Sequence, residues 1–132
     1  MKLIEDVKQE EGFRGEVYKC TEGFDTIGYG TKLPINEHEA ELLLNYRLNK
    51  TIGAIKSSLY DLQIDDRAWN ILYNMGYQIG VYGLLKFKNM IKALRHKDYE
   101  RASIEMLDSK WAKQTPNRAN RLAQEMFIIG KG

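Results

Sequence analysis

The sequence predicts an α+β fold, mostly α, with a small N-terminal β lobe, a long connecting helix and a C-terminal helical lobe. Two observations support this prediction. Five glycines punctuate short β-prone runs between residues 12 and 33, and apolar residues recur at helical spacing from residue 40 onward. The 132 residues suffice for one domain. We expect residues 13–35 to form the β lobe, 36–59 the connecting helix, and 60–132 together with helix 2–11 the helical lobe.

The first predicted element is a short helix over residues 2–11, which Gly12 ends. Glu11 then lies in the last turn, where its negative charge opposes the helix dipole and its neighbour Glu10 adds repulsion. Both effects favour the protonated acid, the form that a general acid needs. From the local sequence alone, however, the plainer interpretation is favoured, that both are solvated glutamates at a frayed helix end.

A hairpin is predicted around residues 21–23. A three-residue loop would pair Cys20 directly with Thr26, whereas a two-residue loop would place them on opposite faces, and the sequence leaves the register open. The spacing of Glu11, Cys20 and Thr26 could bring an acid, a thiol and a hydroxyl to one point.

Helices follow the hairpin. Asn36 and Glu39 form a capping box at the start of a long helix with an apolar stripe from residue 40 to 59. Asp65 or Asp66 caps the next helix, and glycines at 80 and 83 break the chain before a further apolar stripe. We expect a cleft between the two lobes to be the ligand site.

The last helices have their own start signals. Asp98 caps a short helix. A capping hydroxyl at Thr115 and a proline at the first position, Pro116, begin the final helix, which Gly130 ends.

Charge is distributed unevenly along the chain. Residues 1–80 carry 9 Lys+Arg and 13 Asp+Glu, whereas residues 81–132 carry 11 and 5. The basic half could hold an anionic polymer such as nucleic acid, a membrane surface or cell wall, or it could be a solvated face. Its cations are scattered, without the tight runs of nucleic-acid arms.

Composition limits the cofactor and compartment. A lone cysteine cannot form an internal disulfide, and no second His or Cys gives His38 metal-site spacing, so we expect neither metal nor cofactor. No apolar run approaches the about 18 residues of a membrane span, and the N-terminal residues resemble neither a signal peptide nor an anchor. We expect a protein made in a cytosol.

Three blocks of sequence resemble the T-even phage lysozyme family, whose members include endolysins. The blocks are Glu11–Gly30, with its Thr26-Ile27-Gly28-Tyr29-Gly30 run; Asn74–Gly80, followed by Gly83 and Phe87; and Ser109–Ala119 with its Gln-Thr-Pro-Asn-Arg string. They fall in the family's order and cover most of the chain, which favours a functional Glu11 over a solvated one.

The resemblance implies a muramidase that hydrolyses the β-1,4 bond between N-acetylmuramic acid and N-acetylglucosamine in peptidoglycan. Glu11 matches the general acid and Thr26 the residue that helps place the attacking water. Arg118 matches a basic residue near the acid, where it could steady Glu11 or engage peptide-stem carboxylates. The positions that match the family's substrate-binding residues are Leu33, Tyr77, Gln78 and Arg118.

Cys20 departs from the family pattern, because well-known members carry an aspartate there. A thiol is only a few per cent thiolate at pH 7 unless its surroundings, Lys19 among them, raise that fraction. Cys20 could position water, act as base, attack the sugar directly, or be a small buried hydrophobe. A second departure is length, since only residues 31–35 separate the hairpin from the next helix, and a C-terminal docking tail is expected to be absent or vestigial.

The first functional hypothesis is an endolysin, monomeric and held in the bacterial host's cytoplasm, that needs a separate holin-type membrane permeabiliser to reach peptidoglycan. The second is a catalytically weak or inactive peptidoglycan-binding module of the same fold. A DNA-binding protein and a thiol hydrolase built on Cys20 and His38 are less favoured alternatives. No nucleic-acid partner is expected.

Overall fold

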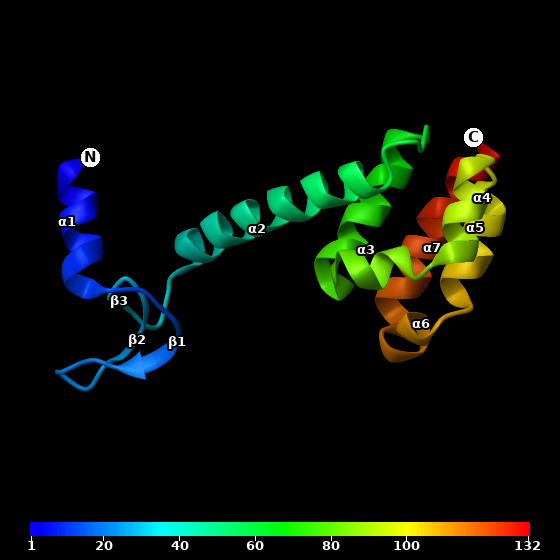
Figure 1. Ribbon diagram of the computed structural model, residues 1–132. Helices are drawn as coiled ribbons and strands as arrows, with labels where there is room; N and C mark the ends of the chain where they lie inside the picture. Colours follow the sequence, from blue (N-terminus) through cyan, green and yellow to red (C-terminus); the bar gives the residue numbers. More distant parts are fainter. The chain divides into compact units, whose positions relative to one another are not determined.

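The structure, a computed structural model, describes residues 1–132. It divides into two compact units, Met1–Leu44 and Asn45–Gly132, and Figure 1 traces their elements. Most of the chain is helical, with one small antiparallel sheet, which confirms the predicted α+β class. The predicted division into lobes, with the first helix assigned to the helical lobe, stays a prediction.

The first unit holds α1 (Lys2–Glu11), β1 (Arg14–Lys19), β2 (Asp25–Gly28), β3 (Thr31–Lys32) and the first turns of α2 (Glu37–Ser58). The three strands form one antiparallel sheet in the order β1-β2-β3. The helix and the hairpin are confirmed. The sequence did not predict β3, which has only two residues and leaves the β lobe as small as expected.

The capping box of α2 is confirmed by two reciprocal hydrogen bonds. The backbone N–H of Asn36 donates to Glu39 Oε1 at 3.0 Å, and that of Glu39 donates to Asn36 Oδ1 at 2.8 Å. The predicted apolar stripe is buried only near its end, at Ile55 and Leu59. The helix therefore packs tightly only over its last turns.

The second unit contains the end of α2 and α3 (Asp66–Leu85), α4 (Lys88–Arg95), α5 (Tyr99–Leu107), α6 (Lys110–Gln114) and α7 (Pro116–Lys131). Helix α7 packs against α3, α5 and α6, and α5 packs against α4 (Figure 1). Their apolar faces meet in one core. Its largest fully buried side chains include Leu72, Met75, Leu84, Met90, Leu94, Met106, Leu122 and Met126.

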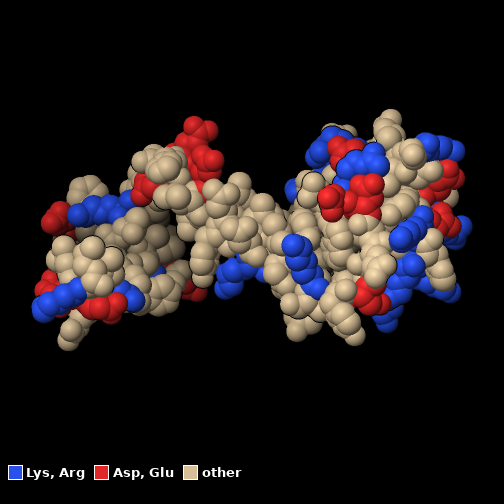
Figure 2. All heavy atoms as spheres, turned by 90° about the horizontal axis from the view of Figure 1, so that it is seen from above, with Lys and Arg blue, Asp and Glu red and all other residues tan.

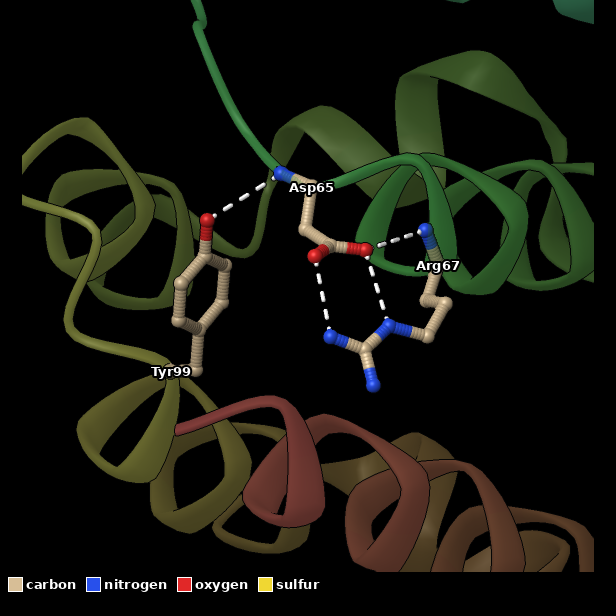
Figure 3. A network of polar contacts seen from close by, with 3 residues as sticks. All are labelled: Asp65, Arg67 and Tyr99. Carbon is tan, nitrogen blue, oxygen red and sulfur yellow. Dashed lines mark hydrogen bonds and ion pairs between the residues drawn. The ribbon is translucent and has the colours of Figure 1, made fainter. Parts of the chain in front are cut away.

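Asp65 caps α3, one of the two starts that the sequence allowed. Its Oδ1 accepts a hydrogen bond from the backbone N–H of Arg67 at 2.8 Å, and both carboxylate oxygens accept from the Arg67 guanidinium at 2.9 Å. Its own N–H donates to the hydroxyl of Tyr99 on α5 at 3.1 Å (Figure 3). The start of α3 is therefore tied to a neighbouring helix. Asp98 caps α5 as predicted.

One predicted glycine break is confirmed and two glycines do not end a helix. Gly80 has non-helical backbone angles, φ 82° and ψ 160°, and interrupts α3 as predicted, whereas Gly83 lies within the helical stretch that continues to Leu85. Gly130 was predicted to end the last helix, but α7 continues to Lys131.

The start of α7 is right in position but wrong in its cap. Pro116 begins the helix as predicted, but the hydroxyl of Thr115 donates to the carbonyl of Trp111 at 3.0 Å and caps nothing. Thr115 is turned back because a further short helix, α6, precedes it. The sequence prediction missed α6, whose N-cap is Ser109.

Charged side chains of both signs share the surface of the second unit. On the face that Figure 2 shows, the blue and red atoms of this unit are interspersed rather than gathered in one basic stripe. Ion pairs account for part of this mixture, among them Arg95 with Asp61 at 2.9 Å and Lys131 with Glu100 at 2.8 Å. This distribution does not favour the DNA-binding alternative.

Candidate active site

A small polar pocket of about 170 Å³ lies within the first unit. It brings together the acid, the thiol and the hydroxyl that the sequence singled out. We call it the Glu11 pocket, and its lining residues are Glu11, Tyr18, Cys20, Thr21, Glu22, Thr26, Gly30 and Lys32. Leu33, expected among the substrate-binding residues, does not line it, and its neighbour Lys32 does.

The sheet explains why distant residues share this pocket. Thr26 on β2 lies opposite Tyr18 on β1 and opposite Lys32 on β3. Residues directly opposite one another in a sheet point to the same face. Cys20 follows Tyr18 by two positions, so it points to that face as well. Tyr18, Thr26 and Lys32 therefore form a row of side chains at the base of the pocket. The thiol of Cys20 lies diagonally beside the hydroxyl of Thr26.

The loop that sets this register differs in one respect from the prediction. It has three residues, 21–23, and the N–H of Gly23 donates to the carbonyl of Cys20 at 2.9 Å. Such a loop pairs Cys20 with Phe24, whose carbonyl accepts from the Cys20 N–H at 2.9 Å. The expectation that it would pair Cys20 with Thr26 was wrong, because that pairing needs two more loop residues.

Glu11 reaches the pocket from the last turn of α1. Its carboxyl lies against Gly30, where an added Cβ would stand 2.5 Å from Glu11 Oε2. Gly30 also has φ +74°, a conformation that other residues adopt only with strain. The positive φ favours glycine at this position, and an added Cβ would displace the end of the Glu11 side chain. The carboxyl therefore lies against the backbone of Gly30 on one side.

Thr26 is the one buried polar residue of the first unit, with 1% of its surface exposed. Its hydroxyl donates to the carbonyl of Phe24 at 2.8 Å. The hydroxyl hydrogen is thus engaged, and the oxygen retains lone pairs that can accept a hydrogen bond from a water or a thiol.

The surroundings of Cys20 lower the pKa of its thiol. The largest cause is a hydrogen bond from the backbone of Phe24, opposed by partial burial and supported by the backbone of Glu22 and the side chain of Thr26. The Thr26 contribution is the weaker argument, because its single hydroxyl hydrogen already donates to a carbonyl. Lys19, which we considered as a cause, instead forms an ion pair with Asp25 at 2.7 Å.

The other predicted substrate-binding residues belong to the second unit. Tyr77 is 41% exposed on α3. Gln78 Oε1 accepts a hydrogen bond from the indole N–H of Trp111 at 2.9 Å. The guanidinium of Arg118 donates to Asn74, at 2.6 Å from Nη2 to Oδ1 and 2.9 Å from Nε to Oδ1.

These contacts tie α3 to α6 and α7 within the second unit. The Gln78 and Arg118 side chains are therefore held in fixed positions. The expected closeness of Arg118 to Glu11 stays a prediction.

Sequence reasoning missed one pocket residue entirely: Lys32, which belongs to the unpredicted strand β3. The other lining residues without an assigned role, Tyr18, Thr21, Glu22 and Gly30, lie within the first motif block. The alternation of side chains along β2 does not extend across the turn to Lys32. Only the pairing of β3 with β2 shows that Lys32 is on the same face as Thr26. No group of three or more His, Cys, Asp or Glu side chains comes together in a way that could hold a metal ion.

Comparison with known proteins identifies the family. The family model described as phage lysozyme matches residues 8–125. The chain belongs to the phage lysozyme family. It is therefore a glycoside hydrolase of the lysozyme type, as its sequence motifs predicted.

Individual relatives support the same family assignment. The chain is 30% identical to "Probable T4-type lysozyme 1" of Dictyostelium discoideum, and the match covers 88% of each protein. It is 29% identical to "Probable T4-type lysozyme 2" of the same organism, covering 91% of the chain and 90% of that relative. It is also 30% identical to the "Pre-baseplate central spike protein Gp5" of Enterobacteria phage T4, of which it spans 28%. No helix has the length and apolar character that crossing a membrane requires.

Proposed function

We propose that this member of the phage lysozyme family is a muramidase, which hydrolyses the β-1,4 bond between N-acetylmuramic acid and N-acetylglucosamine in peptidoglycan. The observation that carries the proposal is the Glu11 pocket, where Glu11, Cys20 and Thr26 lie together. Glycoside hydrolysis with inversion needs an acid on the leaving-group side and a group that activates or places water on the other.

Glu11 is the proposed general acid. In its protonated form it gives its proton to the glycosidic oxygen as the bond from that oxygen to the anomeric carbon breaks. Its carboxyl lies against the backbone of Gly30, which occupies the space on one side of it. Such a contact is useful here, because proton transfer requires hydrogen-bond geometry in the transition state.

Cys20 and Thr26 form the proposed water side. The oxygen of a water molecule bonds to the anomeric carbon, and one of its protons passes to the Cys20 thiolate or, when Cys20 is a neutral thiol, to solvent. The lowered pKa of the Cys20 thiol enlarges the thiolate fraction at neutral pH. Thr26, whose hydroxyl hydrogen is engaged, accepts a hydrogen bond from the same water. Direct attack of the thiolate on the sugar is the less favoured alternative.

The remaining predicted residues have supporting roles in this proposal. Leu33, Tyr77 and Gln78 contact the glycan, and Arg118 steadies Glu11 or binds a peptide-stem carboxylate. The exposure of Tyr77 and the fixed side chains of Gln78 and Arg118 support these assignments.

Analysis of the cleaved ends tests the bond. Peptidoglycan is digested with the purified protein, the new reducing ends are reduced with borohydride, and the sugar alcohols are identified after acid hydrolysis. A muramidase leaves muramic acid at the new end, so its alcohol is the expected product. The alcohol of glucosamine would show cleavage of the other glycosidic bond, and no new reducing ends would contradict the proposed activity.

The departure at Cys20 favours one second candidate, an inactive peptidoglycan-binding module. Comparison of Cys20→Ala with Cys20→Asp separates the two candidates. The muramidase proposal expects Cys20→Ala to lose activity and the wild type to be inactivated when a thiol reagent labels Cys20. An inactive wild type that gains activity only as Cys20→Asp would identify the binding module.

For its role in the cell we propose an endolysin that acts as a monomer in host lysis and accumulates in the cytoplasm of the bacterial host. It then needs a holin-type partner to reach the wall. Expression in bacteria with and without a membrane permeabiliser tests this, since lysis is expected only with it.

A further inference from the structure

One cation stands in the Glu11 pocket. Lys32 lies directly opposite Thr26 across β2 and β3 and lines the pocket with Glu11 and Cys20. Its ammonium nitrogen is 5.9 Å from the centre of the Phe24 ring, within reach of a cation–π interaction. Phe24 lies two positions from Thr26, so its ring is on the same face of the sheet. The charge is therefore kept on the side where the catalytic residues lie.

The charge of Lys32 has no carboxylate partner in the protein. The other lysines of the first unit's helix and strands all form ion pairs: Lys2 with Asp6, Lys8 with Glu5 and Lys19 with Asp25. Lys32 forms none, although Glu11 and Glu22 line the same pocket. Its ammonium group is accordingly available to a ligand.

We infer that Lys32 is a specificity-determining residue, whose ammonium group binds a carboxylate carried by the glycan next to the bond that is cleaved. The inference rests on the proposed function and extends it to the choice of sugar. N-acetylglucosamine is neutral, whereas muramic acid carries a lactyl group whose carboxyl is either free or joined to a peptide with carboxylates of its own. A cation in the pocket favours the acidic sugar over the neutral one.

Matched substrates isolate this contact. Glycan strands freed of their peptide stems carry free lactyl carboxylates, and coupling those carboxylates to methylamine with a carbodiimide gives the same strands without charge. Lys32→Met is expected to lower kcat/KM about tenfold on the charged strands, which is about 1.4 kcal/mol, and less than twofold on the neutralised strands. Lys32→Arg is expected to retain most of the activity, because it keeps the charge.

Lys19→Met is the matched control, since Lys19 is on the same sheet, is ion-paired with Asp25 and does not line the pocket. Both strand types are expected to be cleaved by it within twofold of wild type. Intact peptidoglycan forms a third arm. A Lys32→Met loss seen there and not on stem-free strands would assign the carboxylate to the peptide stem and still support the inference.

Equal losses on charged and neutralised strands, or no loss on any substrate, would overturn the inference. Binding of the same strands by calorimetry gives an independent comparison. If the wild type cleaves nothing, the proposed muramidase activity fails. The role of Lys32 is then decided by whether Lys32→Met weakens binding to charged strands alone.

Discussion

The two units of the protein differ most in how they are held together. Residues 45–132 bury every hydrophobic side chain of the core, from Ile55 to Ile129. Residues 1–44 bury none, and their one buried residue is Thr26. The first unit nevertheless contains the whole Glu11 pocket. Packing therefore stabilises one region, and the candidate chemistry is built in the other.

The contrast teaches how a thinly packed region can still fix the positions of the residues that line a pocket. The Glu11 pocket relies on a three-residue loop, a two-residue strand and glycine at position 30, which are backbone devices. The helical unit relies on apolar burial, which contributes about 25 cal/mol for each Å² removed from water. Substitutions should therefore separate the two: core changes should alter stability, and changes at the pocket should alter rate.

The largest expected stability effect is at Leu72, which is fully buried. Leu72→Ala should lower the free energy of unfolding by about 2–5 kcal/mol, because it leaves a cavity in the core. Val17→Ala in the first unit, where the side chain is 56% exposed, should change it by no more than about 0.5 kcal/mol. Urea unfolding measures both. Similar losses from the two variants would contradict the contrast between the units.

The next prediction distinguishes the cost of backbone strain from the effect of displacing the Glu11 carboxyl. Gly30 and Gly28 have nearly equal φ, +74° and +71°, but only at Gly30 would an added Cβ collide with Glu11. Both alanine variants should lose about 1 kcal/mol of stability to left-handed strain. Only Gly30→Ala should also lower kcat, by at least about tenfold, because the carboxyl must move.

Steady-state kinetics on peptidoglycan, with unfolding measured alongside, distinguishes the two glycine variants. Binding of undigested glycan strands should be similar in both. Equal kcat in Gly28→Ala and Gly30→Ala would show that the contact between Gly30 and Glu11 does not matter for the reaction.

The smallest expected effect is on the pH dependence of stability, through Asp65 in the second unit. Hydrogen bonds from Arg67 lower the pKa of Asp65 from 3.8 to about 2. A carboxyl whose pKa is lower in the folded state stabilises the protein above the unfolded pKa. This contribution is present above about pH 4 and is lost as the pH falls towards 2.

Asp65→Asn isolates that charge, because asparagine can still cap the helix. The melting temperature of wild type should exceed that of Asp65→Asn at pH 5–7 by a small margin, since the ion pair is exposed, and the two should converge by pH 2. A difference that persists unchanged at pH 2 would contradict the ionic contribution.

Much of the fold could be predicted because its signals are local. The capping box at Asn36, the cap at Asp65 and the proline start at Pro116 each depend on residues within a few positions. The sequence failed where a neighbour decided the outcome. Thr115 was predicted to cap α7, but the unrecognised helix α6 supplied a carbonyl for its hydroxyl.

The candidate site was predictable to a similar extent. Motifs identified Glu11, Cys20 and Thr26, and the structure places them in one pocket. Lys32 was missed because a strand of two residues has no periodicity to detect. The cause of the lowered Cys20 pKa was also missed, because it comes from the Phe24 backbone rather than from a charged side chain.

The activity of Glu11→Gln tests most directly the claim that the Glu11 pocket is the active site. Glutamine keeps the shape that fits against Gly30 but has no acidic proton to give. We predict that release of reducing ends from peptidoglycan falls by about 10²–10⁴-fold, with the unfolding transition unchanged. A Glu11→Gln protein that keeps more than about a tenth of the wild-type rate would contradict the account.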